Sequence, residues 1–317
     1  MQVNSRKRER AILGQIGDAD LRLLRVFKSV VDCGGMAAAE LELNIGTSTV
    51  SRHVADLEGR LGLRLCRRGR GGFALTPEGE RVYHEILRLL GSVQAFRSSI
   101  DDIHHRMEGQ LEIAVFDKTA SNPEARIHRA VELFTVRAPE VALSLYVSHI
   151  NGIERGLLGG EFQVGIVPAH RSSKALQYSD LFGETMLLYC GAGHPLFAED
   201  AAVLTWARVR EMPFAGLGYH SPNMEVSHRQ RLQRSATGFD QEAIITLILS
   251  GRFLGFLPDH YAESFVKTRL LRAVHPQRFR YTCRFAAVVR RSPEPNRAAR
   301  AFVKCLQEAH GLIPTTD

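Results

Sequence analysis

The sequence predicts an α+β multidomain protein with an N-terminal winged helix-turn-helix, a long linker helix and a C-terminal two-lobed α/β domain. Three observations support this fold class. Two short helical patterns separated by a polar turn are followed at once by a segment rich in glycine and arginine. A heptad-like apolar pattern then continues through residues 82–103. After it, short strand patterns alternate with helical patterns, which is typical of parallel α/β units.

The helix-turn-helix is predicted over residues 36–61. An alanine-rich helix, Met36–Leu43, precedes the turn Asn44-Ile45-Gly46, where we expect Gly46 to supply a positive backbone angle. The second helix carries an apolar stripe, formed by Val50, Val54, Leu57 and Leu61. Its other face is small and polar, which would let the helix approach base edges in a major groove. The residues of this helix predicted to bind DNA are Thr47, Ser48, Thr49, Ser51 and Arg52.

A basic, glycine-rich segment follows the second helix. It contains Arg64, Arg67, Arg68, Arg70, Gly69, Gly71 and Gly72. Glycines allow a tight hairpin, and arginines bind phosphates or enter the minor groove. A solvated basic loop is the alternative, but the position directly after a helix-turn-helix favours a wing. Arg67, Arg68 and Arg70, the three wing arginines, are therefore predicted to bind DNA.

Residues 31–76 resemble the N-terminal domain of LysR-type transcriptional regulators. The family pattern includes V-S-x-x-I-x-x-L-E-x-x-L-G in the second helix and L-T-x-x-G after the wing. This chain matches the longer family pattern at Ala38, Ala39, Val50, Ser51, Val54, Leu57, Glu58, Leu61, Gly62, Leu65, Arg68, Leu75, Thr76 and Gly79. It departs from the pattern at Gly46, at Thr47-Ser48, where the family usually has Gln-Pro, and at Cys66. Because Thr47-Ser48 stands in place of the usual Gln-Pro, the base preference of other family members is not assigned to this chain.

The resemblance implies a sequence-specific DNA-binding regulator of transcription that responds to a small-molecule effector. Its expected partners are double-stranded promoter or operator DNA, the effector, further copies of the chain in a homodimer or homotetramer, and RNA polymerase. The charge distribution agrees with DNA binding. Of the net charge of +7, most lies in residues 1–76, which contain 13 Lys+Arg and 8 Asp+Glu. Residues 1–17, which include the basic segment Ser5–Arg10, are expected to form an N-terminal arm.

Neither a signal peptide nor an apolar run of the ~18–20 residues needed to cross a membrane is found in the sequence, so a cytoplasmic protein without a membrane partner is expected. The cysteines are scattered and lack metal-ligand spacing, which favours core thiols over a redox switch or a metal site. They are Cys33, Cys66, Cys190, Cys283 and Cys305. No cofactor is expected.

A linker helix is predicted over residues 77–108, after a winged helix-turn-helix domain at residues 18–76. Thr76-Pro77 is a typical helix start, and Gly109 is a typical break. Its apolar seam consists of Val82, Ile86, Leu89, Val93, Phe96, Ile100 and Ile103. A seam this narrow favours a coiled-coil-like dimer over packing on the same chain. The resemblance likewise implies a dimerisation helix.

Residues 109–317 are expected to form the effector-binding domain. Lobe I is predicted at about residues 109–170 and 270–310, and lobe II at about residues 171–269. Two lobes joined by two crossovers resemble a periplasmic-binding-protein fold. The predicted strands include 111–115, 141–147, Phe162–Val167, Thr185–Cys190, Pro213–Leu217, Gly251–Pro258 and Cys283–Val289. The predicted helices are Glu124–Arg137, Ile150–Leu158, Asp240–Ser250 and Asn296–His310.

Ligands of such folds bind between the lobes, at the carboxyl ends of the strands. The effector-binding candidates in the corresponding loops are Lys118, Thr119, Ser148, His149, Tyr219, His220 and Thr237. Basic and hydroxyl groups near helix N-termini favour an anion, such as a small carboxylate with or without an aromatic ring. For any single candidate, a solvated loop residue is the alternative.

Catalysis is not expected from this sequence. It contains no G-x-S-x-G elbow, no G-x-x-x-x-G-K-[ST] phosphate loop and no H-E-x-x-H zinc motif. His104-His105 would point in different directions on a helix and make a poor metal site. A small-molecule-binding protein or an α/β enzyme without a role in transcription is the alternative function. Neither would explain the helix-turn-helix pattern.

Overall fold

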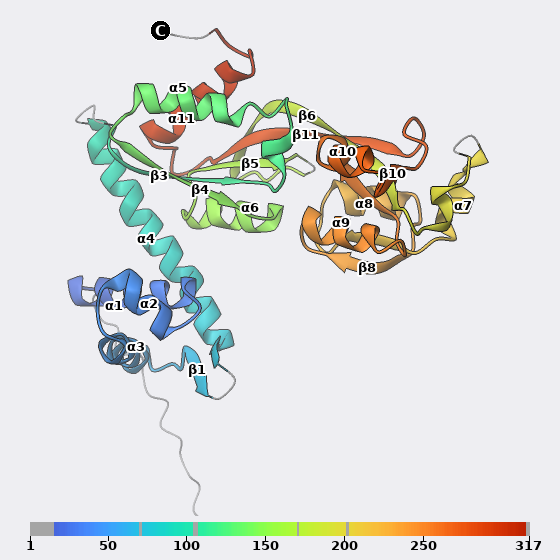
Figure 1. The fold of residues 1–317 in the computed structure, drawn as a ribbon. Coiled ribbons are helices and arrows are strands. Elements are labelled where there is room, and N and C mark those ends of the chain that lie inside the picture. Colours follow the sequence, from blue (N-terminus) through green and yellow to red (C-terminus); the bar gives the residue numbers. More distant parts are fainter. Residues whose placement is uncertain (1–15, 70–71, 104–106, 170, 201–202, 315–317) are drawn as a thin grey trace, which may run out of the picture. The chain divides into compact units, whose positions relative to one another are not determined.

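The computed structural model describes residues 16–69, 72–103, 107–169, 171–200 and 203–314. Contacts divide the chain into two compact units, Met1–Gln94 and Ala95–Asp317 (Figure 1), and each has its own hydrophobic core. His104-His105 and Arg70 lie outside the described residues.

Three helices and a hairpin form the first unit together with the beginning of a long helix. The buried side chains Phe27 and Val30 of α1 pack with Val50, Val54 and Leu57 of α3, so the predicted stripe does lie in a core. The elements are α1 (Asp18–Asp32), α2 (Met36–Leu43), α3 (Thr47–Leu61), β1 (Cys66–Gly69), β2 (Gly72–Leu75) and α4 (Pro77–Ile103).

The turn between α2 and α3 differs from the prediction. The residue with a positive angle is Asn44, at φ 51°, whereas Gly46 has φ −61° and is the N-cap of α3. Asparagine is one of the few residues other than glycine that adopts the left-handed region readily. The prediction that Gly46 supplies the positive angle is therefore wrong.

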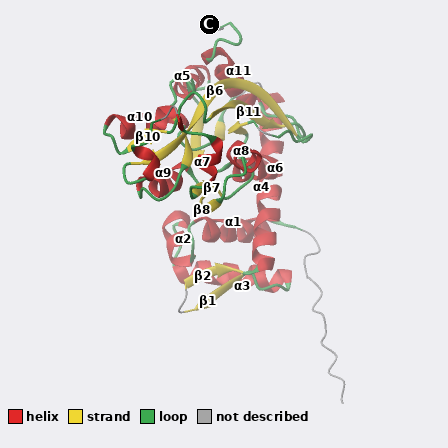
Figure 2. Cartoon of the chain, turned by 90° about the vertical axis from the view of Figure 1, so that its right-hand side faces the viewer, coloured by secondary structure: helices red, strands yellow, loops and turns green. Residues whose placement is uncertain are grey.

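The predicted wing is an antiparallel hairpin, drawn next to α3 in Figure 2. Its register pairs Cys66 with Leu75 and Gly69 with Gly72. Helix α4 begins at Pro77 as predicted, and the Thr76 hydroxyl caps it by accepting a hydrogen bond from the Gly79 N–H at 2.9 Å.

The second unit contains a mixed sheet with helices on both faces. Strand β3 pairs in parallel with both β4 and β5, which confirms the predicted parallel α/β arrangement. Helices α5 and α11 cover one face of this part of the sheet and α6 covers the other (Figure 1). The elements of this lobe are β3 (Gly109–Val115), η1 (Thr119–Ser121), α5 (Ile127–Arg137), β4 (Val141–Val147), α6 (Ile150–Gly159), β5 (Val164–Pro168) and α11 (Arg297–Ala309).

Two long antiparallel strands, β6 (Leu176–Gly191) and β11 (Arg280–Arg290), continue from this lobe into the next one. The sheet order is β10-β6-β11-β5-β3-β4, with β9 also paired to β6, and β7-β8 forms a separate parallel pair. The second lobe contains η2 (Pro195–Phe197), α7 (Trp206–Arg210), β7 (Phe214–Leu217), α8 (Pro222–Arg229), β8 (Arg234–Gly238), α9 (Gln241–Leu249), β9 (Gly255–Pro258), α10 (Asp259–Lys267) and β10 (Leu271–Ala273).

Several predicted boundaries move in the structure. The strand expected at Thr185–Cys190 is the second half of β6, because β6 pairs with β11 from Leu176 onward. The helix expected from Glu124 begins at Ile127, because the Asn122 side chain accepts the Glu124 N–H at 2.9 Å in a local turn. The strand expected at Phe162–Val167 is β5 (Val164–Pro168), the one at Gly251–Pro258 is only β9, and those at Pro213–Leu217 and Cys283–Val289 are β7 and β11.

Other local predictions are confirmed. The Asp240 carboxylate caps α9 by accepting the Ala243 N–H at 2.7 Å. All five cysteines are free and four of them are buried, but Cys33 is half-exposed, so the core prediction fails there. Cys33 donates to the Glu42 carboxylate at 2.7 Å. Among the described helices, none is long and apolar enough to cross a membrane.

Candidate functional site

Helix α3 presents a polar face to solvent because its apolar stripe is fixed in the core. Ser48, Arg52 and Ala55 are exposed on that face. Within the described part of the chain, no hydrogen bond or ion pair engages the Arg52 guanidinium, so it is available to a ligand. The Thr47 hydroxyl, in contrast, donates to the Glu40 carboxylate of α2 and tethers the two helices.

Glu58 holds the wing against α3. Its buried carboxylate accepts the Leu65 N–H at 2.8 Å and the Cys66 N–H at 3.3 Å, and it pairs with Arg64 at 3.0 Å. From the sequence, Glu58 is distinguished only as one of the residues that match the family pattern. Its position before an arginine-rich turn could have suggested an anchor, because buried carboxylates require donors.

A groove of about 740 Å³ lies between α3 and the wing. It is lined by Ala55, Arg64, Cys66, Arg67 and Thr76. Among the described lining residues two are arginines and none is acidic, which suits a phosphate backbone. Arg67 is exposed. The side chain of Arg68 lies outside the described part, as does Arg70.

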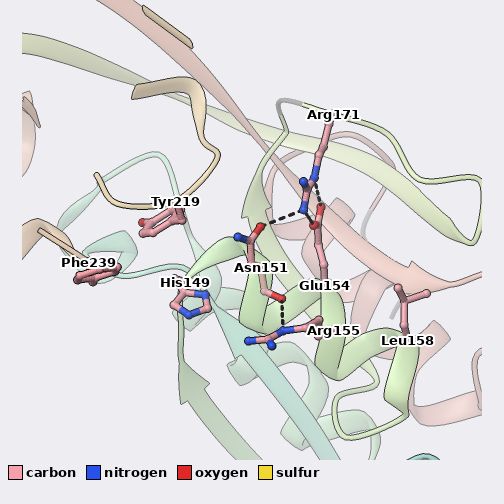
Figure 3. Close-up of a pocket in the computed structure, with 8 residues that line it drawn as sticks. All are labelled: His149, Asn151, Glu154, Arg155, Leu158, Arg171, Tyr219 and Phe239. Carbon is pink, nitrogen blue, oxygen red and sulfur yellow. Dashed lines mark hydrogen bonds and ion pairs between the residues drawn. The ribbon is translucent and has the colours of Figure 1, made fainter. Parts of the chain in front are cut away.

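A second pocket, of about 540 Å³, lies in the α/β unit (Figure 3). On the lobe I side the pocket is lined mainly by α6, and on the lobe II side it is lined by the loops after β7 and β8. The lining residues are His149, Asn151, Glu154, Arg155, Leu158, Arg171, Tyr219 and Phe239.

His149 connects the helix to the pocket. Its Nδ1 accepts the Gly152 N–H at 2.8 Å and thereby caps α6, which leaves the proton of a neutral ring on Nε2. The ring lies 5.5 Å from that of Tyr219, a lobe II residue. Two of the predicted effector residues are therefore brought together.

The charged residues of the pocket have different environments. Arg171 pairs with the buried carboxylate of Glu154 and donates to the Asn151 side chain at 3.0 Å. The hydrogen bond that Arg171 donates to Glu154 raises the pKa of Arg171 above its ordinary value. Arg155 is exposed, and its Nε donates to the Asn151 carbonyl at 3.3 Å. The described residues provide no carboxylate partner for Arg155. Sequence reasoning missed Glu154 and Arg155 because they lie within α6 rather than in a loop after a strand, and it did not single out Arg171 in the loop after β5.

The other predicted effector residues do not line this pocket. Lys118 pairs with Glu242 at 2.5 Å and lies 4.6 Å from the Tyr261 ring centre. Thr119 is buried and donates to the Phe116 carbonyl at 3.2 Å. His220 lies 3.7 Å from Glu225, Thr237 is exposed on β8, and Ser148 is half-buried. Of Lys118, His149 and His220, only His149 lines this pocket.

A half-buried carboxylate lies where the loop after β3 contacts lobe II. Asp117 accepts the Gln241 N–H at 2.7 Å, and burial raises its pKa from 3.8 to about 6. Lys118 and Ser121 also bridge this loop to lobe II, since Ser121 lies 2.9 Å from His260 Nδ1. In the described residues, no cluster of His, Cys, Asp or Glu suits a metal ion.

A winged helix-turn-helix and a two-lobed α/β unit with an interlobe pocket together define a ligand-responsive DNA-binding regulator. The comparisons with known proteins agree with this class. The family described as "Bacterial regulatory helix-turn-helix protein, lysR family" matches residues 21–80, and the family described as "LysR substrate binding domain" matches residues 104–311. The chain belongs to the LysR family of transcriptional regulators.

Relatives and solved structures support the same assignment. The chain is 37% identical over 294 residues to the HTH-type transcriptional activator BauR of Pseudomonas aeruginosa, which covers 93% of this chain and 96% of that protein. It is 25% identical over 218 residues to the transcriptional activator protein LysR of Escherichia coli, with 69% and 67% covered. A full-length CbnR structure in complex with target DNA has a TM-score of 0.59 at 19% identity, covering 91% and 99%, which supports the fold. Because its relatives are transcriptional regulators, the chain is not an enzyme.

Proposed function

We propose that the chain reads operator DNA with the exposed face of α3 and the wing, and that a small anionic effector bound between its lobes controls this binding. The residues proposed to contact DNA are Thr47, Ser48, Thr49, Ser51, Arg52, Arg67, Arg68 and Arg70. Arg52 is exposed on the α3 face and has no partner among the described residues, which supports major-groove reading, because arginine binds guanine in a bidentate manner. Thr47 contributes by its tether to Glu40, which sets the position of the helix N-terminus.

The exposed guanidinium of Arg155 is the main observation in support of an anionic effector. Counting ionised side chains, the pocket lining holds two arginines and one glutamate, so it has an excess of one positive charge. A small carboxylate would neutralise that excess and form charge-assisted hydrogen bonds. His149 and Tyr219 belong to this proposed site. Lys118, Thr119, Ser148, His220 and Thr237 are proposed to act in the surrounding loops, where Lys118 ties the lobes together.

Effector control requires contacts from both lobes, because a ligand shifts an equilibrium only by its difference in affinity for the two states. The pocket meets this requirement with α6 on one side and Tyr219 and Phe239 on the other. We further propose that the protein acts in the cytoplasm as a homodimer or homotetramer. We expect it to activate transcription through RNA polymerase, since the relatives BauR and LysR are named as activators.

Gel-shift titration of an operator at fixed salt tests the DNA-reading surface. Arg52→Ala should weaken specific binding by about 1–3 kcal/mol while the circular dichroism spectrum stays unchanged. Arg88→Ala is the matched control, because Arg88 is an exposed arginine on α4 that pairs with Glu85. Equal operator affinity of wild type and Arg52→Ala would reject the assigned face of α3.

A further inference from the structure

Two exposed apolar side chains lie in the effector pocket described above. Phe239 is 63% exposed and Leu158 is 42% exposed, although both are large hydrophobic residues. Exposed apolar groups that line one concave site commonly mark a place where a ligand covers them. In Figure 3, Phe239 and Tyr219 lie on one side of His149, and Arg155 and Leu158 lie on the other. Aromatic surface and free positive charge are thus separated within the pocket.

The position of Phe239 is fixed by the backbone beneath it. A Cβ atom at Gly218 would lie 2.7 Å from the Phe239 ring and 2.8 Å from the Thr237 methyl, so this ring is seated on a glycine. Gly218 is itself held by a hydrogen bond of 2.8 Å from its N–H to the Gly238 carbonyl. One edge of the ring therefore lies close to the Gly218 backbone while much of the side chain remains open to solvent.

Tyr219 and His149 add two more rings at the same end of the pocket. Their ring centres are 5.5 Å apart with an interplanar angle of 37°, and Tyr219 is only 7% exposed. Aromatic rings gain from offset or edge-on contact with other rings, beyond the area that they bury. A flat, unsaturated group is therefore favoured over an aliphatic chain of similar size.

The polar end of the pocket sets the charge of the ligand. Glu154 and Asn151 already engage Arg171, so Arg155 is the lining cation without a carboxylate partner in the described structure. One guanidinium with free terminal nitrogens matches one carboxylate in a bidentate pair. We propose that the pocket binds an aromatic monocarboxylate, with its ring against Phe239 and Tyr219 and its carboxylate on Arg155. This inference rests on the proposed function, which states only that the effector is an anion.

Titration calorimetry of the full-length protein with four probes tests the inference. Benzoate has both an aromatic ring and a negative charge. Cyclohexanecarboxylate has the charge but no aromatic ring, benzamide has the ring but no charge, and acetate has the charge but no ring of any kind. We expect benzoate to bind about two- to tenfold more tightly than cyclohexanecarboxylate, the range that ring contacts provide. Benzamide and acetate should bind more weakly than both.

Variants assign the binding to this pocket. Arg155→Gln should weaken benzoate binding about tenfold to a hundredfold and leave benzamide binding unchanged. Phe239→Leu should remove the preference for benzoate over cyclohexanecarboxylate. Arg129→Gln is the matched control, because Arg129 is an exposed arginine on α5 that pairs with Glu132.

The outcomes separate the two proposals. Equal affinities for benzoate and cyclohexanecarboxylate, both sensitive to Arg155→Gln, would overturn the aromatic class and retain the anionic effector. Benzamide binding as tightly as benzoate would overturn both. Benzoate binding that is unchanged in Arg155→Gln would show that the ligand lies elsewhere and overturn the assigned site.

Discussion

The replacement of Gly79 by alanine should loosen the wing from α4. A Cβ atom at this position would lie 1.9 Å from the carbonyl oxygen of Leu65 and 2.8 Å from its carbonyl carbon. Because an unstrained heavy-atom contact is about 3.5 Å, the two backbone segments would have to separate by more than 1 Å. They are joined by the Thr76 N–H, which donates to the Leu65 carbonyl at 3.0 Å. No side-chain rotation can relieve a clash with backbone.

The cost follows from two contributions. Overpacking of a close contact costs about 1–3 kcal/mol, and a weakened hydrogen bond adds about 0.5–1.5 kcal/mol. A loss of about 2–4 kcal/mol corresponds to amide exchange in the wing and α3 that is roughly 30-fold to several-hundred-fold faster. Hydrogen exchange of the full chain, followed by mass spectrometry, measures this for Gly79→Ala at constant pH.

The matched control is Gly59→Ala, because Gly59 lies within α3 and a Cβ atom there would meet nothing within 4 Å. Alanine in a helix interior is more favourable than glycine by about 1 kcal/mol, so exchange should slow. The two glycine replacements should therefore have opposite signs. Unchanged or slower exchange in Gly79→Ala would refute the steric explanation of the glycine in the L-T-x-x-G pattern.

Three further predictions concern other parts of the chain. Replacing the three wing arginines by alanine should flatten the slope of log affinity against log salt concentration, by up to about 0.9 for each phosphate contact that is lost. An unchanged slope would show that the wing does not bind DNA phosphates. Asp117→Asn should stabilise the α/β unit by up to about 3 kcal/mol at pH 8, measured by the fluorescence of the single tryptophan, Trp206. The folded carboxyl has the higher pKa, about 6 against 3.8, so wild-type stability rises as pH falls through that window and the gain should vanish below pH 3.8. The double variant Phe96→Glu, Ile100→Glu should dissociate the dimer, as measured by light scattering. His84→Glu, on the opposite face of the helix, should leave the dimer intact. If the double variant has the same mass in solution as the wild type, this segment does not belong to the interface.

The sequence predicted those features that depend on local spacing. The α3 stripe, the Thr76 and Asp240 caps and the parallel strand pattern could be predicted because neighbouring residues determine them. The full length of β6 could not, since it depends on pairing with β11, which is about a hundred residues further along the chain. Non-local pairing leaves only a weak trace in a local pattern of apolar residues.

The candidate site shows the same division. His149 and Tyr219 were predicted from their places after strands, and they do lie together. Lys118 and His220 occupy equivalent places, but nearby acidic residues, Glu242 and Glu225, engage them. Arg155 was missed because its importance comes from what surrounds it. Glu154 pairs with Arg171 and not with Arg155, and among the described residues Arg155 has no carboxylate partner. Only the tertiary structure shows which of the two arginines is paired.

The apolar seam of α4 shows how one pattern can serve two purposes. Ile86 is 3% exposed and lies in the core of the first unit, and Val82 and Leu89 pack against that core. Phe96 and Ile100 continue the same spacing but are 67% and 39% exposed. The prediction that the whole seam faces a partner is therefore wrong for its first half, because the three helices of the first unit cover it. A charge at Leu89 would destabilise this core, so that a loss of the dimer could not be told from a loss of the fold. The exposed half of the seam can carry a charge in the monomer. The proposed dimer contact is thus restricted to the part of the helix beyond Leu89.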